Sequence, residues 1–165
     1  MRTSAAAIGS AAFFVAAPGT VVGIIPLLIT RWEIPGSTAA ARAVQVVGVL
    51  LIVAGLVPLV HAFTQFARAG GTPMPLAPTQ RLVVTGFNRY VRNPMYVGLM
   101  LAIVGQALLF GSPALLLYAA LVWIATASFV RWYEEPTLVG QFGTQYDEYR
   151  RNVRAWVPRL RPWVT

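Results

Sequence analysis

Two polar clusters flank one apolar stretch of this chain, and both carry charged side chains. The first, residues 89–98, reads Arg-Tyr-Val-Arg-Asn-Pro-Met-Tyr-Val-Gly and runs straight into apolar sequence. The second is Glu134-Glu135-Pro136, which closes the next apolar stretch. Charged groups beside hydrocarbon are expensive to keep and usually mark a site. The two clusters therefore predict a membrane-embedded site that holds a polar cofactor next to a lipid-like substrate.

The pair Asn93-Pro94 is expected to begin a helix, because Asn is a favoured N-cap and Pro a favoured first helical residue. A helix start offers free N–H groups that bind anions. Arg89 and Arg92 stand beside it and can donate to a carboxylate or phosphate. Both arginines could instead serve only as anchors at a membrane face. The sequence does not separate these roles for Arg89, whereas for Arg92 it favours the site.

Three more residues of this segment have both a structural and a functional interpretation. Tyr90 and Tyr96 are of the type enriched at membrane interfaces. Tyr96 falls in the first helical turn, however, where its hydroxyl can face a pocket. Gly98 permits close helix approach, which packing alone also explains.

Glu134 and Glu135 are expected at a helix end, because Pro136 disfavours helix at the preceding residue and cannot continue it. Carboxylates at that end oppose the helix dipole, so they need a compensating cation. Arg131 can supply it, and so can a bound cationic ligand. The interpretation we favour has one carboxylate facing an arginine and the other facing a ligand ammonium.

The composition indicates an integral membrane protein. Of 165 residues, 57% are hydrophobic and 11% are charged, and no cysteine is present. Disulfides, thiolate nucleophiles and Cys-based metal sites are excluded, and the single histidine, His61, makes no His-rich metal site. The net charge of +8 comes with thirteen arginines. In a membrane protein this excess indicates topology and contact with anionic lipid, so no nucleic-acid partner is expected.

Four apolar segments predict an all-α, polytopic fold with about four transmembrane helices. They are residues 5–29, 43–66, 94–110 and 113–130. Only Gly111-Ser112 separates the last two, which predicts a tight helical hairpin with Pro113 in the first turn of its second helix. Residues 1–165 are expected to form one membrane domain: two N-terminal spans (1–66), a loop (67–93), the hairpin (94–130), and an interfacial helix and tail (131–165).

With four spans, the arginines divide 11 to 2 between the two sides of the membrane. The positive-inside rule then places both termini, the loop and the polar clusters on the cytoplasmic side. Beyond Pro136, apolar residues recur at spacings of three and four, as on one face of an amphipathic helix. They are Leu138, Phe142, Tyr146, Tyr149, Val153 and Trp156. This helix can lie among lipid headgroups or pack back over the site as a lid, and one helix can do both.

Residues 70–162 closely resemble the integral-membrane methyltransferases of the isoprenylcysteine carboxyl methyltransferase and phospholipid N-methyltransferase group. The resemblance rests on a set of short segments that occur in one order: Gly71-Thr72-Pro73, residues 82–86 and 89–98, Glu134-Glu135, Phe142-Gly143, Tyr146, Tyr149 and Val157-Pro158-Arg159. It implies S-adenosylmethionine as the methyl donor and S-adenosylhomocysteine as the product. It also implies a membrane-borne lipid or prenyl-type acceptor.

The resemblance further implies which residues form the donor site. One wall would be Tyr90, Arg92, Asn93, Pro94, Tyr96 and Gly98, and the other Glu134 and Glu135. Tyr146, Tyr149 and Arg150 would close the site from the C-terminal helix. Arg92 and Glu135 are expected to be the catalytic pair. The donor is a zwitterion, so an anion-binding helix start and a carboxylate suit it.

One departure from the family bears on the mechanism. Many carboxyl methyltransferase relatives carry His where this chain has Asn93, and Asn cannot act as a general base at neutral pH. Methyl transfer to an ionised carboxylate needs no base, whereas transfer to an amine needs one, for which a glutamate is available. The competing hypothesis is a non-catalytic membrane protein that binds anionic lipid or a partner through its arginine-rich face. The acceptor and the oligomeric state stay open.

Overall fold

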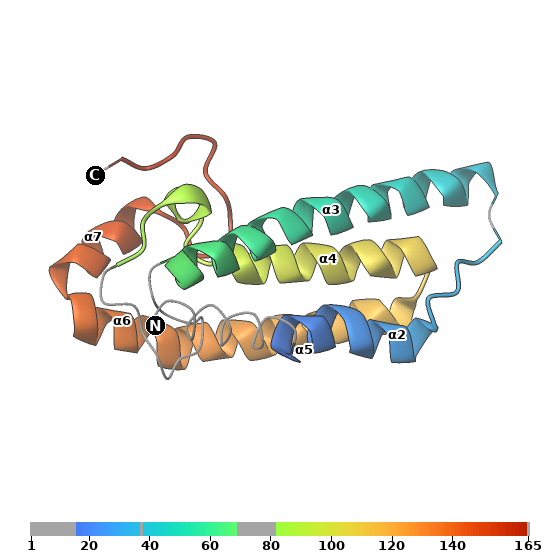
Figure 1. Cartoon of the computed structure of the whole chain (residues 1–165), viewed down its shortest axis with the longest axis horizontal. Helices are drawn as coiled ribbons and strands as arrows, with labels where there is room; N and C mark the ends of the chain where they lie inside the picture. Colours follow the sequence, from blue (N-terminus) through green and yellow to red (C-terminus); the bar gives the residue numbers. More distant parts are fainter. Residues whose placement is uncertain (1–15, 37, 69–81, 165) are drawn as a thin grey trace.

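The computed structural model describes residues 16–36, 38–68 and 82–164, and within these ranges it contains helices and connecting segments but no strand (Figure 1). The predicted all-α class is therefore confirmed for the part of the chain described. The elements, where η marks a π- or 3-10 turn, are η1 (Gly19–Ile24), α2 (Ile25–Thr30), α3 (Ala39–Arg68), η2 (Gly86–Arg89), α4 (Pro94–Phe110), α5 (Pro113–Phe129), η3 (Val130–Glu134), α6 (Glu135–Phe142) and α7 (Thr144–Asn152).

Two helices are long and apolar enough to cross a membrane, Ala39–Ala62 and Pro113–Phe142. The segments Ala16–Thr30 and Pro94–Phe110 form shorter apolar helices. The count of four spans thus stays a prediction. The first part of the predicted N-terminal span (residues 5–15) and nearly half of the predicted loop (69–81) lie outside the described residues. Large apolar side chains of α3 and α5 point outward, as lipid-facing helices require.

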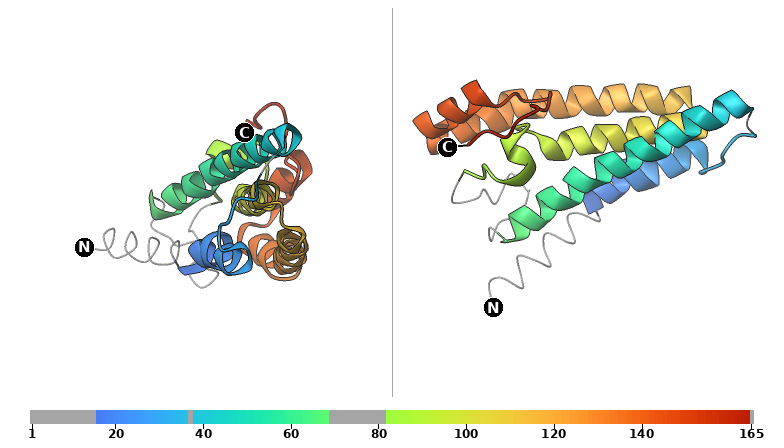
Figure 2. Two further views of the ribbon diagram at one scale, coloured as in Figure 1. Left: turned by 90° about the vertical axis from the view of Figure 1, so that its right-hand side faces the viewer. Right: turned by 90° about the horizontal axis from the view of Figure 1, so that it is seen from above.

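Helix α4 lies between α2, α3 and α5 (Figure 2). It packs antiparallel to α3 through two glycine pairs, Gly48 with Gly105 and Gly55 with Gly98. A Cβ built on Gly48 would lie 2.6 Å from the carbonyl oxygen of Gly105, and Gly105 shows the same distance to Gly48. Gly55 and Gly98 approach each other even more closely. Small residues at these positions let the two backbones touch, which is how apolar helices associate in lipid.

A buried polar side chain ties the N-terminal helix to this bundle. Pro26 has no N–H, so the carbonyl of Val22 lacks its usual helical partner. The Nε2 of Gln106, whose residue is only 6% exposed, donates to this carbonyl at 2.9 Å. The hydroxyl of Tyr118 on α5 donates to the neighbouring carbonyl of Val21 at 3.0 Å. The two contacts satisfy backbone groups that the apolar surroundings would otherwise leave unpaired.

The prediction that a helix ends at Glu134 and Glu135 is wrong. The chain continues through η3 into α6, and both glutamates have helical backbone angles. In the wider turn of η3, the N–H of Glu135 donates to the carbonyl of Val130, five residues back. Pro136 then falls in the first turn of α6, where an N–H is not needed. The turn therefore accommodates the proline without ending the helix.

The single C-terminal helix predicted over residues 138–156 is also wrong. It is two helices, α6 and α7, which meet at Gly143 with φ 51° and ψ −124°, angles that a residue with a Cβ rarely adopts. Val153 and Trp156 follow α7 in non-helical chain. The apolar residues still meet, because the bend folds α7 back: Tyr146, Tyr149 and Val153 form a buried cluster against Leu138, Val139, Phe142, Leu82, Val84 and Trp163.

Candidate functional site

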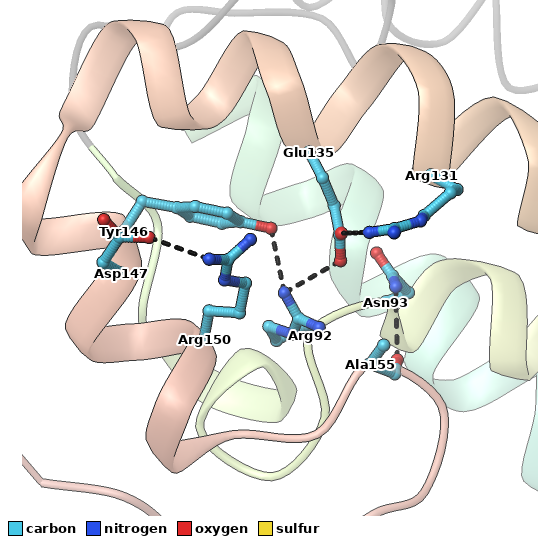
Figure 3. A network of polar contacts seen from close by, with 8 residues as sticks. All are labelled: Arg92, Asn93, Arg131, Glu135, Tyr146, Asp147, Arg150 and Ala155. Carbon is cyan, nitrogen blue, oxygen red and sulfur yellow. Dashed lines mark hydrogen bonds and ion pairs between the residues drawn. The ribbon is translucent and has the colours of Figure 1, made fainter.

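The side chain of Arg92 joins the segment before α4 to both C-terminal helices (Figure 3). Its Nη1 lies 2.9 Å from Oε1 of Glu135 on α6, and the two side chains are only 12% and 13% exposed. The same nitrogen donates to the hydroxyl of Tyr146 on α7 at 3.1 Å. A shielded, hydrogen-bonded ion pair of this kind is strongly oriented. The ion pair therefore fixes the position in which the guanidinium could bind a ligand.

Glu135 has a second cation nearby, but this one contributes little. Nη1 of Arg131 is 3.9 Å from Oε2 of Glu135, and its side chain is 75% exposed. Exposed ion pairs at such distances are weak because solvent screens them. Arg92 is thus the main partner of Glu135, which agrees with the expectation that one carboxylate of the pair faces an arginine.

The other carboxylate, Glu134, faces the first turn of α4. The hydroxyl of Tyr96 donates to Oε1 of Glu134 at 2.7 Å. The ring of Tyr96 also lies 6.4 Å from that of Trp156, between ring centroids. The two sequence clusters therefore meet in space through two contacts, Arg92 with Glu135 and Tyr96 with Glu134. One negative charge, on Glu134, is left without a cation among these residues.

Tyr146 and Tyr149 close this region from α7 and remain neutral phenols. Burial raises the pKa of Tyr146 above its usual value, against the opposing effect of the Arg92 charge. Burial also raises the pKa of Tyr149. The hydroxyl of Tyr149 donates to the carbonyl of Asn88 at 2.6 Å, which ties α7 to η2. Arg150 lies beside Tyr146 (Figure 3), and its guanidinium pairs with Asp147 at 3.1 Å.

The C-terminal tail runs along residues 89–93 and fixes them by backbone hydrogen bonds. The N–H groups of Arg92 and Asn93 donate to the carbonyls of residues 154 and 155, at 2.9 and 3.3 Å. In return, the N–H groups of Arg159 and Trp163 donate to the carbonyls of Tyr90 and Arg89, both at 2.9 Å. The segment that carries Arg92 is thus clamped by chain more than sixty residues further on.

Asn93 and Pro94 begin α4 as predicted, but the Asn93 side chain does not cap it. Its Nδ2 donates instead to the carbonyl of Ala155 at 3.2 Å (Figure 3). Gly98, expected on the site wall, faces α3 and does not join the cluster. The ring of His61 packs against Gly86 and lies edge-on to the ring of Phe87, with 5.0 Å between ring centroids.

Sequence reasoning missed the role of the tail at the site. Trp156 was predicted only as part of a helical stripe, yet its ring lies between those of Tyr96 and Trp123. The backbone pairing of the tail has no side-chain signature that could have predicted it. The apolar and aromatic character of residues 153–164 was the one available signal.

The charged residues suit a zwitterionic ligand. Among the described residues, Nε of Arg92 and Nη1 of Arg159 are buried without a hydrogen-bond acceptor. Buried donors of this kind are costly unless satisfied, and a ligand carboxylate would satisfy a guanidinium. The carboxylate of Glu134 accepts from Tyr96 and has further lone pairs for an ammonium. The described residues hold no group of three or more side chains fit to bind a metal.

Comparison with known proteins identifies relatives. The sequence model of a family described as phospholipid methyltransferase matches residues 43–145, which is more than half of the chain. A protein-S-isoprenylcysteine O-methyltransferase from Schizosaccharomyces pombe is 35% identical over 80 residues, which are 48% of this chain and 34% of that protein. The match thus covers about a third of the relative's length. No solved structure matches the chain.

Proposed function

The chain belongs to the phospholipid methyltransferase family, and we propose that it transfers a methyl group from S-adenosylmethionine to a membrane-borne lipid or prenyl-type acceptor. The family predicted from the sequence motifs is thereby confirmed. The relative's name specifies a prenylcysteine acceptor for that protein. For this chain the donor, the acceptor and the cytoplasmic placement of the site are parts of the proposal.

One observation carries the proposal: segment 89–98 meets the glutamate pair through two separate contacts, so that one guanidinium and one carboxylate are each held in place by a partner of their own. Arg92 is oriented by Glu135 and Tyr146, and Glu134 is oriented by Tyr96. When bound, S-adenosylmethionine supplies a methyl group on a positively charged sulfonium. Arg92 would bind the carboxylate of such a donor, and Glu134 would bind its ammonium. Glu135 acts through Arg92 and is a positioning residue in this account.

Rate acceleration would come mainly from positioning. Holding the two reactants in line in a site from which water is excluded can supply a large part of the barrier reduction. The buried Arg92–Glu135 pair and the aromatic rings of Tyr96 and Trp156 provide such surroundings. A carboxylate acceptor would need no base. An amine acceptor would need one, for which a glutamate of the pair is available.

Calorimetric titration of S-adenosylhomocysteine into the detergent-purified protein tests this proposal. We expect saturable binding by the parent and a loss of about tenfold or more in the Glu135→Gln variant, because Arg92 loses its charged partner. Glu148→Gln is the matched control, since Glu148 is exposed on α7 and outside the cluster. Absence of binding by folded parent protein would favour the lipid-binding alternative. Equal affinity of Glu135→Gln and Glu148→Gln for S-adenosylhomocysteine would show that the proposed site is wrong.

A further inference from the structure

A cavity lies apart from the Arg92–Glu135 cluster, between η2 and the C-terminal tail. Its volume is about 180 Å³. This is several times the roughly 30 Å³ that one water molecule occupies in the liquid. The cavity is lined by Val84, Thr85, Gly86, Arg89, Trp163 and Val164. None of these residues takes part in the contacts proposed to hold the methyl donor.

The lining of this cavity suits an anion. Arg89 is its one charged residue, and no Asp or Glu lines it. Within the described ranges Arg89 forms no ion pair. Its guanidinium is nevertheless fixed, because Nε donates to the carbonyl of Trp163 at 2.8 Å while the N–H of Trp163 donates back to the carbonyl of Arg89. A held guanidinium with donors left over is a good phosphate ligand, and the hydroxyl of Thr85 adds another donor.

The position of the cavity favours a lipid headgroup as the source of such a phosphate. Gly86 lines the cavity and packs against the ring of His61, one residue before the end of the candidate membrane span Ala39–Ala62. A side chain at the end of a span lies at the depth of lipid headgroups. The tail beside the cavity also exposes apolar side chains close to arginines: Leu160, between Arg159 and Arg161, is fully exposed, and Val164 is 69% exposed. This alternation is typical of segments that lie in an anionic membrane surface.

We propose that this cavity binds the phosphate group of an anionic membrane phospholipid through Arg89 and Thr85. The lipid's apolar chains would continue along the exposed side chains of the tail. The site does not depend on the proposed methyl transfer. Lipid binding would nevertheless affect methyl transfer, because Arg89 and Trp163 belong to the same paired segments that fix Arg92. A bound lipid would hold the tail in place and make donor binding sensitive to lipid composition.

Native mass spectrometry of the full chain, titrated with phosphatidylglycerol, tests the proposal. We expect one saturable adduct, bound about tenfold or more weakly by Arg89→Gln. Val164→Phe, which enlarges an apolar residue of the lining and leaves the arginine in place, should weaken the binding similarly. Arg161→Gln is the matched control, because Arg161 is an exposed arginine of the same tail outside the lining. We expect that variant to bind like the parent.

Three results would overturn the proposal. Equal weakening by Arg89→Gln and Arg161→Gln would show diffuse attraction to charge rather than a site. Unchanged binding in both Arg89→Gln and Val164→Phe would place the lipid elsewhere. Displacement of the lipid by inorganic phosphate alone, with no preference for the lipid, would make this a free-anion site. If Arg89→Gln fails to fold, the result for Val164→Phe decides the question, with a circular dichroism melt as the check that this variant is folded.

Discussion

Replacing Gly55 by Ala should destabilise the protein, although Ala is the better helix former. A Cβ at this position would collide with the carbonyl oxygen of Gly98 and lie 2.8 Å from the backbone nitrogen of Ala102. Both atoms belong to the backbone of α4, so no side chain can rotate away. Overpacking of this kind costs about 1–3 kcal/mol, and we take the upper half because α4 must shift as a whole. The gain in helix propensity offsets roughly 1 kcal/mol.

The net cost of Gly55→Ala is therefore about 1–2 kcal/mol, or a melting temperature roughly 2–8 °C lower for a chain of this size. Gly140 on α6 provides the matched control, because nothing lies within 4 Å of a Cβ built there. Gly140→Ala should raise the melting temperature by about 2–4 °C through propensity alone. Circular dichroism melts of the three proteins in one detergent measure both shifts.

The two melting temperatures should shift in opposite directions, downward for Gly55→Ala and upward for Gly140→Ala, if α3 and α4 are in close contact. If Gly55→Ala melts at or above the parent, the close contact between α3 and α4 is absent in the folded protein. The same result would also undermine the assignment of Gly98 to helix packing, because Gly98 is the partner of Gly55 in that contact.

Three other perturbations test the site and its supports. Gly143→Ala should lower stability by about 1–3 kcal/mol, because Ala is strained at φ 51° and ψ −124°; a melting temperature equal to the parent's would contradict the bend. Tyr149 has a pKa raised by burial, so the unfolded chain ionises first and stability should fall as pH rises above about 10. The melting temperature of Tyr149→Phe should fall less steeply than that of the parent between about pH 9 and 11. An identical slope for the two proteins would refute this. Arg92→Lys keeps the charge beside Glu135 but lacks the planar fork; we expect S-adenosylhomocysteine to bind about tenfold more weakly in calorimetry, and parent-like affinity would argue against a guanidinium contact.

Sequence patterns predicted the helices whose ends are determined locally. The expected segments 94–110 and 113–130 correspond closely to α4 and α5. Their limits follow from short-range chemistry: Pro94 at a helix start, Gly111 with φ 58° at a helix end, and the Ser112 side chain accepting from the N–H of Leu115 at 3.4 Å. The meeting of residues 89–98 with the glutamate pair was also predictable, because opposite charges beside hydrocarbon must find partners.

The features that sequence patterns failed to predict depend on uncommon backbone conformations or on contacts between distant segments. Pro136 stops a regular helix, and only the wider turn of η3 makes it tolerable. The apolar spacing of residues 138–156 fits one helix, while a single glycine conformation at Gly143 divides it. Asn93 is a good cap in isolation, but the tail offers its side chain the carbonyl of Ala155. Only at Asn93 does a tertiary contact outweigh the local preference, whereas at Pro136 and Gly143 the local backbone adopts a less common conformation.

The central claim is that Glu134 and Arg92 form the donor site of a membrane methyltransferase, and a labelled methyl-transfer assay tests it most directly. Purified protein would be incubated with S-adenosylmethionine tritiated in its methyl group, together with phospholipid or prenylcysteine acceptors, and the label in the lipid phase counted. We predict transfer by the parent and by Glu148→Gln, and a loss of about tenfold or more in Glu134→Gln, with circular dichroism melts as the check that each variant is folded. Equal transfer by Glu134→Gln and the parent would contradict the account, as would absence of transfer to every acceptor by folded parent protein.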